Sequence, residues 1–161
     1  MPVPRRSQTR PAAEALAAVA PLATRWIERV LARHEPALTV QQYLALRAIA
    51  REAVTGSELA RRTGVSGPAV SQLLGGLAGA GLVEREADAE DRRRQALALS
   101  PAGEEAFRSA EELLSRRLGE LLAGLPRPEI DALARLLPSV EAALSGAPPP
   151  RRPPPPPPPR P

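Results

Sequence analysis

The chain has 161 residues and a net charge of +4, which is the size of one domain with short extensions. Apolar residues make up 43% of the sequence but aromatic residues only 2%, so the core must consist mainly of aliphatic side chains, among which Leu favours helices. The absence of cysteine excludes disulfides, thiolate zinc sites and thiol redox switches. Because His34 is the only histidine, a metal site with several histidine ligands is excluded. We expect His34 to be exposed at a helix end, and we expect no metal and no cofactor.

The sequence shows no sign of a membrane or secretory segment. No stretch approaches the roughly 20 apolar residues needed to span a bilayer, and no charge-free apolar run leads to a cleavage site. We therefore expect a cytoplasmic protein with no membrane partner. Residues 38–100 contain eight arginines against seven acidic residues, so any affinity for DNA must depend on where these arginines lie.

The first predicted helix follows a short arm. Residues 1–11 contain three prolines and three arginines and are predicted to be disordered. From Pro11 to His34 the apolar residues follow helical spacing. Pro21 lies within this pattern and removes one backbone donor, so we expect a kink or two shorter helices there.

Three more helices are predicted next, and each begins at a residue type that favours a helix N-terminus. They span residues 39–51, 55–64 and 66–81. In the last of them the apolar residues recur at helical spacing, at Val70, Leu73, Leu74 and Leu77. Two short helices joined by a glycine-containing turn are typical of a helix-turn-helix, although a small helical bundle can contain the same pair.

A β-hairpin is predicted directly after this pair of helices. Residues 82–87 and 95–99 are short strand candidates, and the segment between them is polar and dense in charge. A hairpin that follows a recognition-type helix is the wing of a winged helix. The sequence therefore favours this fold over a helical bundle.

Two helices and a tail complete the chain. Ser100 and Pro101 start a long helix to about residue 123. The helix that follows has a narrow apolar seam suited to pairing with another helix, formed by Ile130, Leu133, Leu137, Val140 and Leu144. Residues 148–161 contain eleven prolines and three arginines and predict a disordered tail. Three interpretations of this tail are open: it is passive, it docks a proline-binding domain, or it contacts DNA phosphates.

The helix over residues 66–80 is the candidate for reading DNA, because the major groove admits one helix. With its apolar face packed inward, the opposite face presents Ser66, Pro68, Ala69, Ser71 and Gln72. Gln72 can form paired hydrogen bonds with adenine, and the serines suit phosphates or base edges. The neighbouring Gly75 and Gly76 either let the backbone approach DNA closely or permit tight helix packing.

Arginines cluster at the tip of the predicted wing, at Arg92, Arg93 and Arg94. One of them, inserted into a minor groove, would meet an enhanced negative potential. Asp91, two residues before Arg93, can hold its guanidinium in a paired salt bridge. A run of charges is often only a solvated surface, but the position on the wing favours DNA contact.

From residue 38 to about residue 103 these segments together resemble the MarR family of winged helix-turn-helix regulators. The resemblance is carried by LTVQQYLALRAI, TGSELARRTGVSGPAVSQLLGGLAGAGLVERE and DAEDRRRQALALSPAG. Asp91 and Arg93 occupy the family's D-x-R wing motif, and Ser100, Pro101 and Gly103 stand where the family usually has Leu-Thr-x-x-Gly or similar. The resemblance implies a mainly α fold with a small β-hairpin wing, that is, a winged helix-turn-helix with N- and C-terminal dimerisation helices.

The resemblance also implies a domain organisation and partners. Residues 12–147 would form one MarR-like domain, in which residues 38–100 bind DNA and residues 12–37 and 101–147 are dimerisation helices. Family members are homodimers that bind palindromic operators in double-stranded DNA and usually repress. Many release DNA when a small aromatic or lipophilic effector enters a cleft between the two lobes. Three aromatic residues lie in segments expected near that cleft, as core residues or as ligand contacts: Trp26, Tyr43 and Phe107.

The sequence departs from the family pattern in three places. Gln72 stands where the family commonly has arginine, Pro21 and Pro138 lie within the dimerisation helices, and the proline tail is foreign to the family core. An uncharged recognition helix and the tail leave a second interpretation, a protein-interaction module that kept the winged-helix fold without specific DNA binding. We expect no enzyme, because the sequence offers no paired carboxylates, no nucleophile with a base and no phosphate loop.

Overall fold

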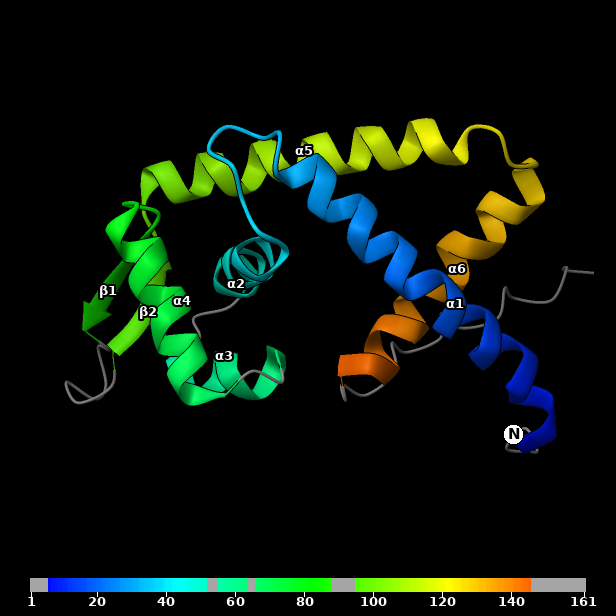
Figure 1. The fold of residues 1–161 in the computed structure, drawn as a ribbon, viewed down its shortest axis with the longest axis horizontal. Coiled ribbons are helices and arrows are strands. Elements are labelled where there is room, and N and C mark those ends of the chain that lie inside the picture. Colours follow the sequence, from blue (N-terminus) through cyan, green and yellow to red (C-terminus); the bar gives the residue numbers. More distant parts are fainter. Residues whose placement is uncertain (1–5, 52–54, 64–65, 88–94, 146–161) are drawn as a thin grey trace, which may run out of the picture. The chain divides into compact units, whose positions relative to one another are not determined.

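The structure is a computed structural model that describes residues 6–51, 55–63, 66–87 and 95–145. Residues 1–118 and 119–161 form two compact units, which we describe in turn. The elements follow one another in the predicted order (Figure 1): α1 (Arg6–Leu31), α2 (Val40–Arg51), α3 (Gly56–Thr63), α4 (Gly67–Gly79), β1 (Val83–Ala87), β2 (Gln95–Leu99), α5 (Pro101–Leu122) and α6 (Arg127–Ser145). The predicted fold class, mainly α with a small β-hairpin, is confirmed.

Helix α1 is longer and more continuous than predicted. It begins at Arg6, so the expectation of a disordered arm over residues 1–11 is wrong for the part from Arg6 onward. An ion pair one turn apart, between Arg10 Nε and Glu14 Oε1 at 2.7 Å, favours helix in this stretch. Pro21 lies inside the same helix, so the expectation of two shorter helices is wrong. A helix of 26 residues accommodates the loss of one backbone donor.

Capping residues open α2 and α3 as predicted. At α2 the backbone N–H of Thr39 donates to Gln42 Oε1 at 2.9 Å, and the N–H of Gln42 donates to Thr39 Oγ1 at 3.1 Å. Both halves of this capping box are therefore formed. At α3 the N–H of Glu58 donates to Thr55 Oγ1 at 3.3 Å. Gly64, the predicted end of α3, lies outside the described residues.

Helix α4 ends in a Schellman motif at Gly81, which confirms the predicted stop. Gly81 has a φ of +71°, a left-handed conformation that glycine adopts without strain. Its N–H donates to Ala78 O at 2.9 Å, and the N–H of Leu82 donates to Leu77 O at 2.9 Å. This turn directs the chain from α4 straight into β1.

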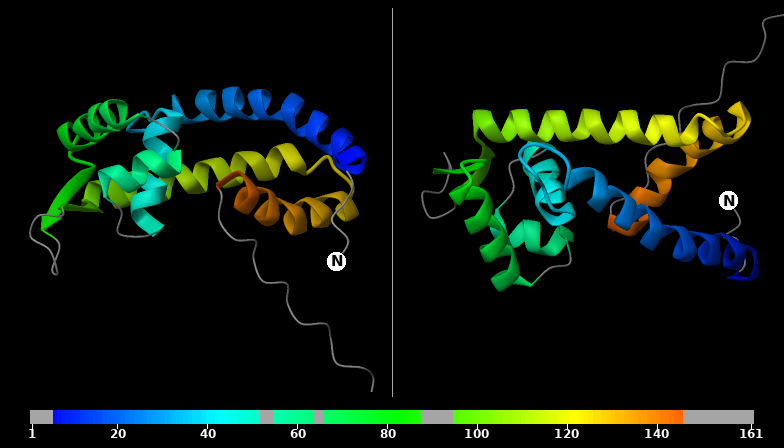
Figure 2. Two further views of the ribbon diagram at one scale, coloured as in Figure 1. Left: turned by 90° about the horizontal axis from the view of Figure 1, so that it is seen from below. Right: turned by 45° about the horizontal axis from the view of Figure 1, so that its top comes forward.

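Strands β1 and β2 form one antiparallel hairpin next to the C-terminal end of α4 (Figure 2). The register runs from the pair Val83 and Leu99 to the pair Ala87 and Gln95. Val83 and Leu97 are buried and Glu84 is exposed, so the hairpin turns one face toward the protein and the other toward solvent. The base of the predicted wing is thus fixed by apolar packing.

A single aliphatic core holds the N-terminal unit together. It joins the end of α1, the three short helices, the hairpin and the first half of α5. Its buried members come from every one of these elements and from the connections between them: Leu31, Leu38, Ala45, Leu46, Ile49, Leu59, Val70, Leu74, Leu77, Leu82, Val83, Leu97, Ala106, Ala110 and Leu114. As the composition predicts, the described core contains no fully buried aromatic residue.

The start of α5 is tied to the end of α4 by a close backbone approach. Ser100 Oγ donates to Gly81 O at 2.5 Å and accepts the N–H of Gly103 at 3.0 Å, so one hydroxyl both caps α5 and binds the preceding turn. A Cβ atom built on Gly103 would lie 1.8 Å from Leu82 O. Only glycine fits at this position, because any side chain there would collide with the backbone.

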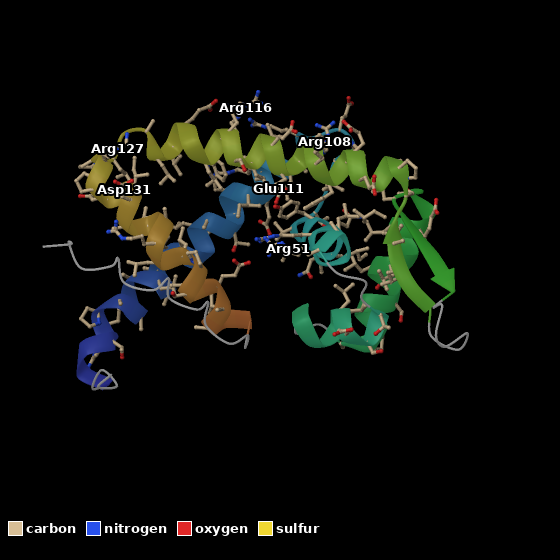
Figure 3. The ribbon with its side chains drawn as sticks, turned by 180° about the vertical axis from the view of Figure 1, so that it is seen from behind. Arg51, Arg108, Glu111, Arg116, Arg127 and Asp131 are labelled. Carbon is tan, nitrogen blue, oxygen red and sulfur yellow. The ribbon has the colours of Figure 1, made fainter. Side chains whose placement is uncertain are left out.

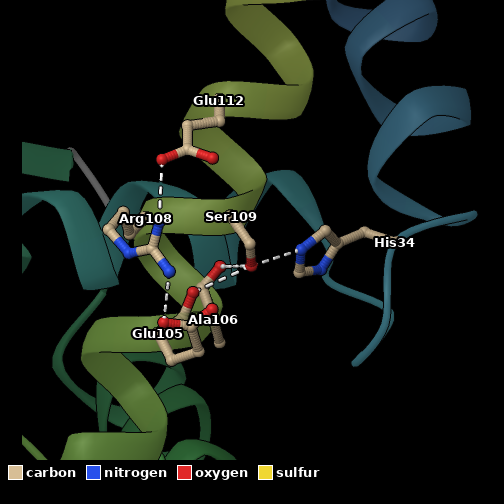
Figure 4. Close-up of polar contacts among 6 residues, drawn as sticks. All are labelled: His34, Glu105, Ala106, Arg108, Ser109 and Glu112. Atoms are coloured by element: carbon tan, nitrogen blue, oxygen red, sulfur yellow. Dashed lines mark hydrogen bonds and ion pairs between the residues drawn. The ribbon is translucent and has the colours of Figure 1, made fainter.

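The prediction that His34 is exposed at a helix end is wrong. It follows α1, but its side chain is only 8% exposed. Nε2 lies 2.9 Å from Ser109 Oγ on α5 (Figure 4). On the other side of the ring, Nδ1 lies 2.8 Å from Pro36 O. Because Pro36 O can only accept, Nδ1 must carry a proton. His34 therefore fastens the end of α1 to α5 through a residue 75 positions away in the sequence.

The second unit contains the end of α5, a short turn and α6. In the turn the N–H of Leu125 donates to Leu122 O at 3.0 Å, and the N–H of Glu129 donates to Pro126 O at 2.9 Å. Pro138 lies inside α6, which continues to Ser145. Among the described helices, none combines the length and apolar character needed to cross a bilayer.

Candidate nucleic-acid interface

Helix α4 has one buried and one exposed face, and the exposed face carries the predicted DNA contacts. Val70, Leu74 and Leu77 are buried against the core, and Leu73 is half-buried. All five predicted contacts on this helix and its cap are exposed: Ser66, Pro68, Ala69, Ser71 and Gln72. The face that the apolar spacing predicts to be exposed is therefore exposed, and none of the described residues covers it.

Ser66 caps α4 with its backbone conformation but not with its side chain. It has an extended conformation (φ −64°, ψ 150°), and its hydroxyl makes no capping hydrogen bond. The N-terminal amides of a helix carry partial positive charge and suit a phosphate. Pro68, in the first turn, is tolerated there because its missing N–H would have no partner inside the helix.

Gly75 and Gly76 do not mediate tight packing of the described elements. A Cβ atom built on either residue meets no other atom within 4 Å. Both residues are exposed on the same side as Gln72. The packing explanation is therefore wrong for this unit, and the close approach of a DNA backbone stays a prediction.

A shallow groove of about 370 Å³ lies between the start of α2 and the exposed face of α4. Its lining comes from Thr39, Gln41, Gln42, Ala69, Gln72, Leu73 and Gly76. No ligand role was predicted from the sequence for Thr39, Gln41 or Gln42, although the capping box at Thr39 fixes where α2 begins. Gln41 and Gln72 provide amide groups in this groove, which can both donate and accept hydrogen bonds.

The charged tip of the wing lies outside the described residues. Asp91, Arg92, Arg93 and Arg94 belong to residues 88–94, between the two strands. The described strands agree with the predicted ranges 82–87 and 95–99, except that β1 begins one residue later, at Val83. The DNA contacts predicted for these four residues stay predictions.

Two of the three aromatic ligand candidates pack against each other. The rings of Tyr43 on α2 and Phe107 on α5 have centroids 5.9 Å apart and an interplanar angle of 31°. Burial raises the pKa of Tyr43, and Glu111 acts in the same direction, whereas the nearby guanidinium groups lower it. Figure 3 shows Glu111 on α5 and Arg51 on α2 in the space between these helices. This arrangement matches the core role that the sequence left open for both rings.

The third candidate, Trp26, is half-buried and lines a separate cavity between α1 and α5. Neither Tyr43 nor Phe107 contributes to that cavity's lining. The structure thus divides the three aromatic residues into a ring pair at the α2–α5 interface and a cavity residue on α1. Among the described residues, no group of three His, Asp or Glu side chains is placed so that it could hold a metal ion.

Residues 38–94 match the sequence model of the MarR family. Over these residues the chain is similar to the MarR family. The matched segment includes all nine predicted DNA contacts on α4 and on the wing, whereas Trp26 and Phe107 lie outside it. The family resemblance expected from the capping, helix-turn-helix and wing segments is confirmed.

Solved structures share the MarR fold over most of the chain. Wild-type MarR from E. coli in its apo form matches with a TM-score of 0.69 and 24% identity, over 87% of this chain and 98% of that chain. The transcriptional regulator BldR from Sulfolobus solfataricus gives 0.67 and 22%, over 84% and 98%. CouR from Rhodococcus jostii RHA1, bound to p-coumaroyl-CoA, gives 0.65 and 22%, over 79% and 89%. These matches confirm the winged-helix fold.

Proposed function

We propose that the protein is a homodimeric transcriptional regulator that binds a palindromic operator and represses until a small ligand releases it. The observation that carries this proposal is the exposed face of α4. It presents small and polar residues beside a hairpin, and this combination fits a helix that enters the major groove with a wing beside it. In a dimer the two α4 helices would meet half-sites about 34–36 Å apart, one turn of B-DNA.

Exposed apolar side chains support the dimer. On α1, Leu16, Val19 and Leu22 lie on solvent, and Leu22 is 62% exposed. In the second unit Leu136, Leu137 and Leu144 of α6 are exposed as well. A chain that leaves so many large aliphatic side chains uncovered is expected to bury them against a partner. Both helices were expected to be dimerisation helices, which makes a second copy the natural partner.

The effector part of the proposal has two supports. CouR, one of the structures that share this fold, was solved with p-coumaroyl-CoA bound. In this chain a cavity of about 430 Å³ lies between α1 and α5, within the range of small-molecule sites. A ligand that favours a dimer with wrongly spaced α4 helices would lower the affinity for the operator.

Fluorescence anisotropy with labelled duplex tests the proposal directly. DNA from upstream of the protein's own gene is titrated against a scrambled duplex of the same length over a range of salt concentrations. We expect tighter binding to the upstream DNA and a loss of affinity with salt, because phosphate contacts release counterions. Equal weak binding to both duplexes at every salt concentration favours the alternative, a protein-interaction module that kept the fold.

Substitution of Gln72 tests base reading by α4. We expect Gln72→Ala to reduce the discrimination between operator and scrambled duplex by about 1–3 kcal/mol, the cost of a lost bidentate contact to a base. Affinity for the scrambled duplex should stay nearly unchanged, because the substitution removes no charge. The measurement is the ratio of the two dissociation constants. An equal loss on both duplexes would mean that Gln72 does not read bases.

Substitution of Arg93 tests the wing. We expect Arg93→Ala to weaken binding to both duplexes by about tenfold at low salt and to lower the slope of affinity against salt by about one charge. Arg116→Ala is the matched control, because Arg116 is exposed on the outer side of α5 (Figure 3). Unchanged binding by Arg93→Ala across salt concentrations would remove the wing from the interface.

A further inference from the structure

The groove between α2 and α4 contains two side-chain amides from different helices. Helices α2 and α4 contact each other within the N-terminal unit, and both supply buried residues to the same core (Figure 1). Gln41 from α2 and Gln72 from α4 line the groove, and both side chains are exposed. The groove therefore holds a second amide in addition to the one that is predicted to read adenine.

The capping box at the start of α2 decides which of two adjacent glutamines has an available amide. Gln42 Oε1 accepts the N–H of Thr39 at 2.9 Å, so the side chain of Gln42 is held at the helix end. Its neighbour Gln41 makes no side-chain hydrogen bond with any residue in the described ranges, and the same is true of Gln72. Of the two glutamines on α2, Gln41 is thus the one whose amide can pair with a new partner.

Small residues on both sides of Gln72 leave its side chain room to turn toward α2. Ala69 lies one turn before Gln72 and Gly76 one turn after it, on the same side of α4, and both line the groove. A Cβ atom built on Gly76 meets no other atom within 4 Å. Because Gln72 lines the groove and is also exposed, it lies at the border between the groove and the outer face of α4.

The hydrogen bonds of Gln72 are incomplete if it contacts adenine alone. A glutamine amide has two N–H donors and two acceptor lone pairs on its oxygen. A bidentate contact with adenine uses one donor and one lone pair, and leaves the other donor and the other lone pair without a partner. When DNA covers α4, these two groups lose their water, and an unpaired buried polar group costs its full desolvation. The amide of Gln41 can pair with one of them, since it can donate or accept.

We propose that Gln41 is a positioning residue that hydrogen-bonds Gln72 in the DNA complex and holds its amide in the orientation that adenine requires. An amide turned by 180° exchanges its donor and its acceptor, and then no longer matches the acceptor N7 and the donor N6 of adenine. A partner on a packed helix favours one orientation and lowers the entropic cost of ordering a flexible side chain. Gln41 acts through Gln72 and touches no base itself. The proposal rests on the proposed function, because it assigns a role within operator binding.

The first step of the test finds the adenine that Gln72 contacts. The operator from the upstream DNA is synthesised with 7-deaza-adenine at one adenine of each half-site at a time, which removes only the N7 acceptor. We expect one position at which the wild-type protein loses about tenfold in affinity and the Gln72→Ala variant loses none, because the lost hydrogen bond is the one that Gln72 donates. The readout is the anisotropy of the labelled duplex.

The second step removes the amide of Gln41. We expect Gln41→Met, which keeps a side chain of similar length, to weaken operator binding by about fivefold and to leave binding to the scrambled duplex unchanged. In the Gln72→Ala background the same substitution should have no further effect, since the side chain that it positions is absent. Ala50→Met is the matched control, because it places methionine at an exposed position on α2 outside the groove, and it should bind like the wild type. If the circular dichroism spectrum of Gln41→Met differs from that of the wild type, Gln41→Ala is measured in its place.

Three results would overturn the proposal. Equal losses by Gln41→Met on the operator and on the scrambled duplex would indicate a contact with DNA phosphates, and the same loss in the Gln72→Ala background would indicate a separate base contact. No loss on the operator would show that Gln41 has no role in binding. In all three cases the wild type still prefers its operator, so the regulator stands and only the positioning role is wrong. Equal weak binding of both duplexes by the wild type would contradict the regulator, and the positioning role with it.

Discussion

Gly103→Ala should destabilise the protein by about 3 kcal/mol or more, although alanine normally stabilises a helix relative to glycine. The added Cβ would lie 1.8 Å from Leu82 O, a contact that only a backbone shift can relieve. That shift would disturb the bond from the N–H of Ser100 to Leu82 O at 3.1 Å and the bond from Ser100 Oγ to Gly81 O. The junction between α4, β1 and α5 would loosen as a whole.

Chemical denaturation followed by circular dichroism measures this change in the free energy of unfolding. Gly119→Ala is the matched control, because Gly119 lies in the same helix and a Cβ there meets nothing within 4 Å. The control should be more stable than the wild type by about 0.5–1 kcal/mol, the gain expected inside a helix. If both variants were equally stable, the close approach at Gly103 would not exist in solution.

Leu22→Arg should convert the protein to a monomer and lower its affinity for the operator by about a hundredfold or more. Leu22 on α1 is 62% exposed. Together with the exposed Val19, one turn before it, it forms an apolar patch on this helix. A buried arginine without a partner across the interface is costly. Loss of the dimer removes the second half-site, and with it the gain from simultaneous binding of two linked sites.

Light scattering coupled to size-exclusion chromatography measures the mass in solution. The wild type should have about twice the chain mass of 17.1 kDa, and Leu22→Arg should have the mass of one chain. Ala50→Arg adds the same charge at an exposed position on α2, outside the predicted dimerisation helices, and should remain dimeric. A dimeric Leu22→Arg variant would show that this part of α1 is not the interface. A monomeric wild type would contradict the dimer itself.

Local sequence signals determined nearly all of the secondary structure. The capping box at Thr39, the glycine at Gly81 and the Ser100–Pro101 pair act within a few residues of themselves, so the helix ends they predict agree with the structure. The exposed face of α4 was predicted for the same reason, because a helical period assigns every residue to a face once the apolar positions are known. The resemblance to the MarR family, too, could be read from motifs in order along the chain.

Contacts between distant segments could not be predicted in this way. His34 is buried because Ser109 on α5 reaches it, and no feature near His34 in the sequence indicates that partner. The sequence does not indicate that Leu113 and Arg117 lie near Trp26, because only the packing of α5 beside α1 forms the cavity that these residues line. Tyr43 and Phe107 could have lined a ligand site, but the packing of α2 on α5 pairs their rings. Helix and turn formation depends on neighbours along the chain, whereas burial and cavities depend on which surfaces meet in space, and only the tertiary structure decides that.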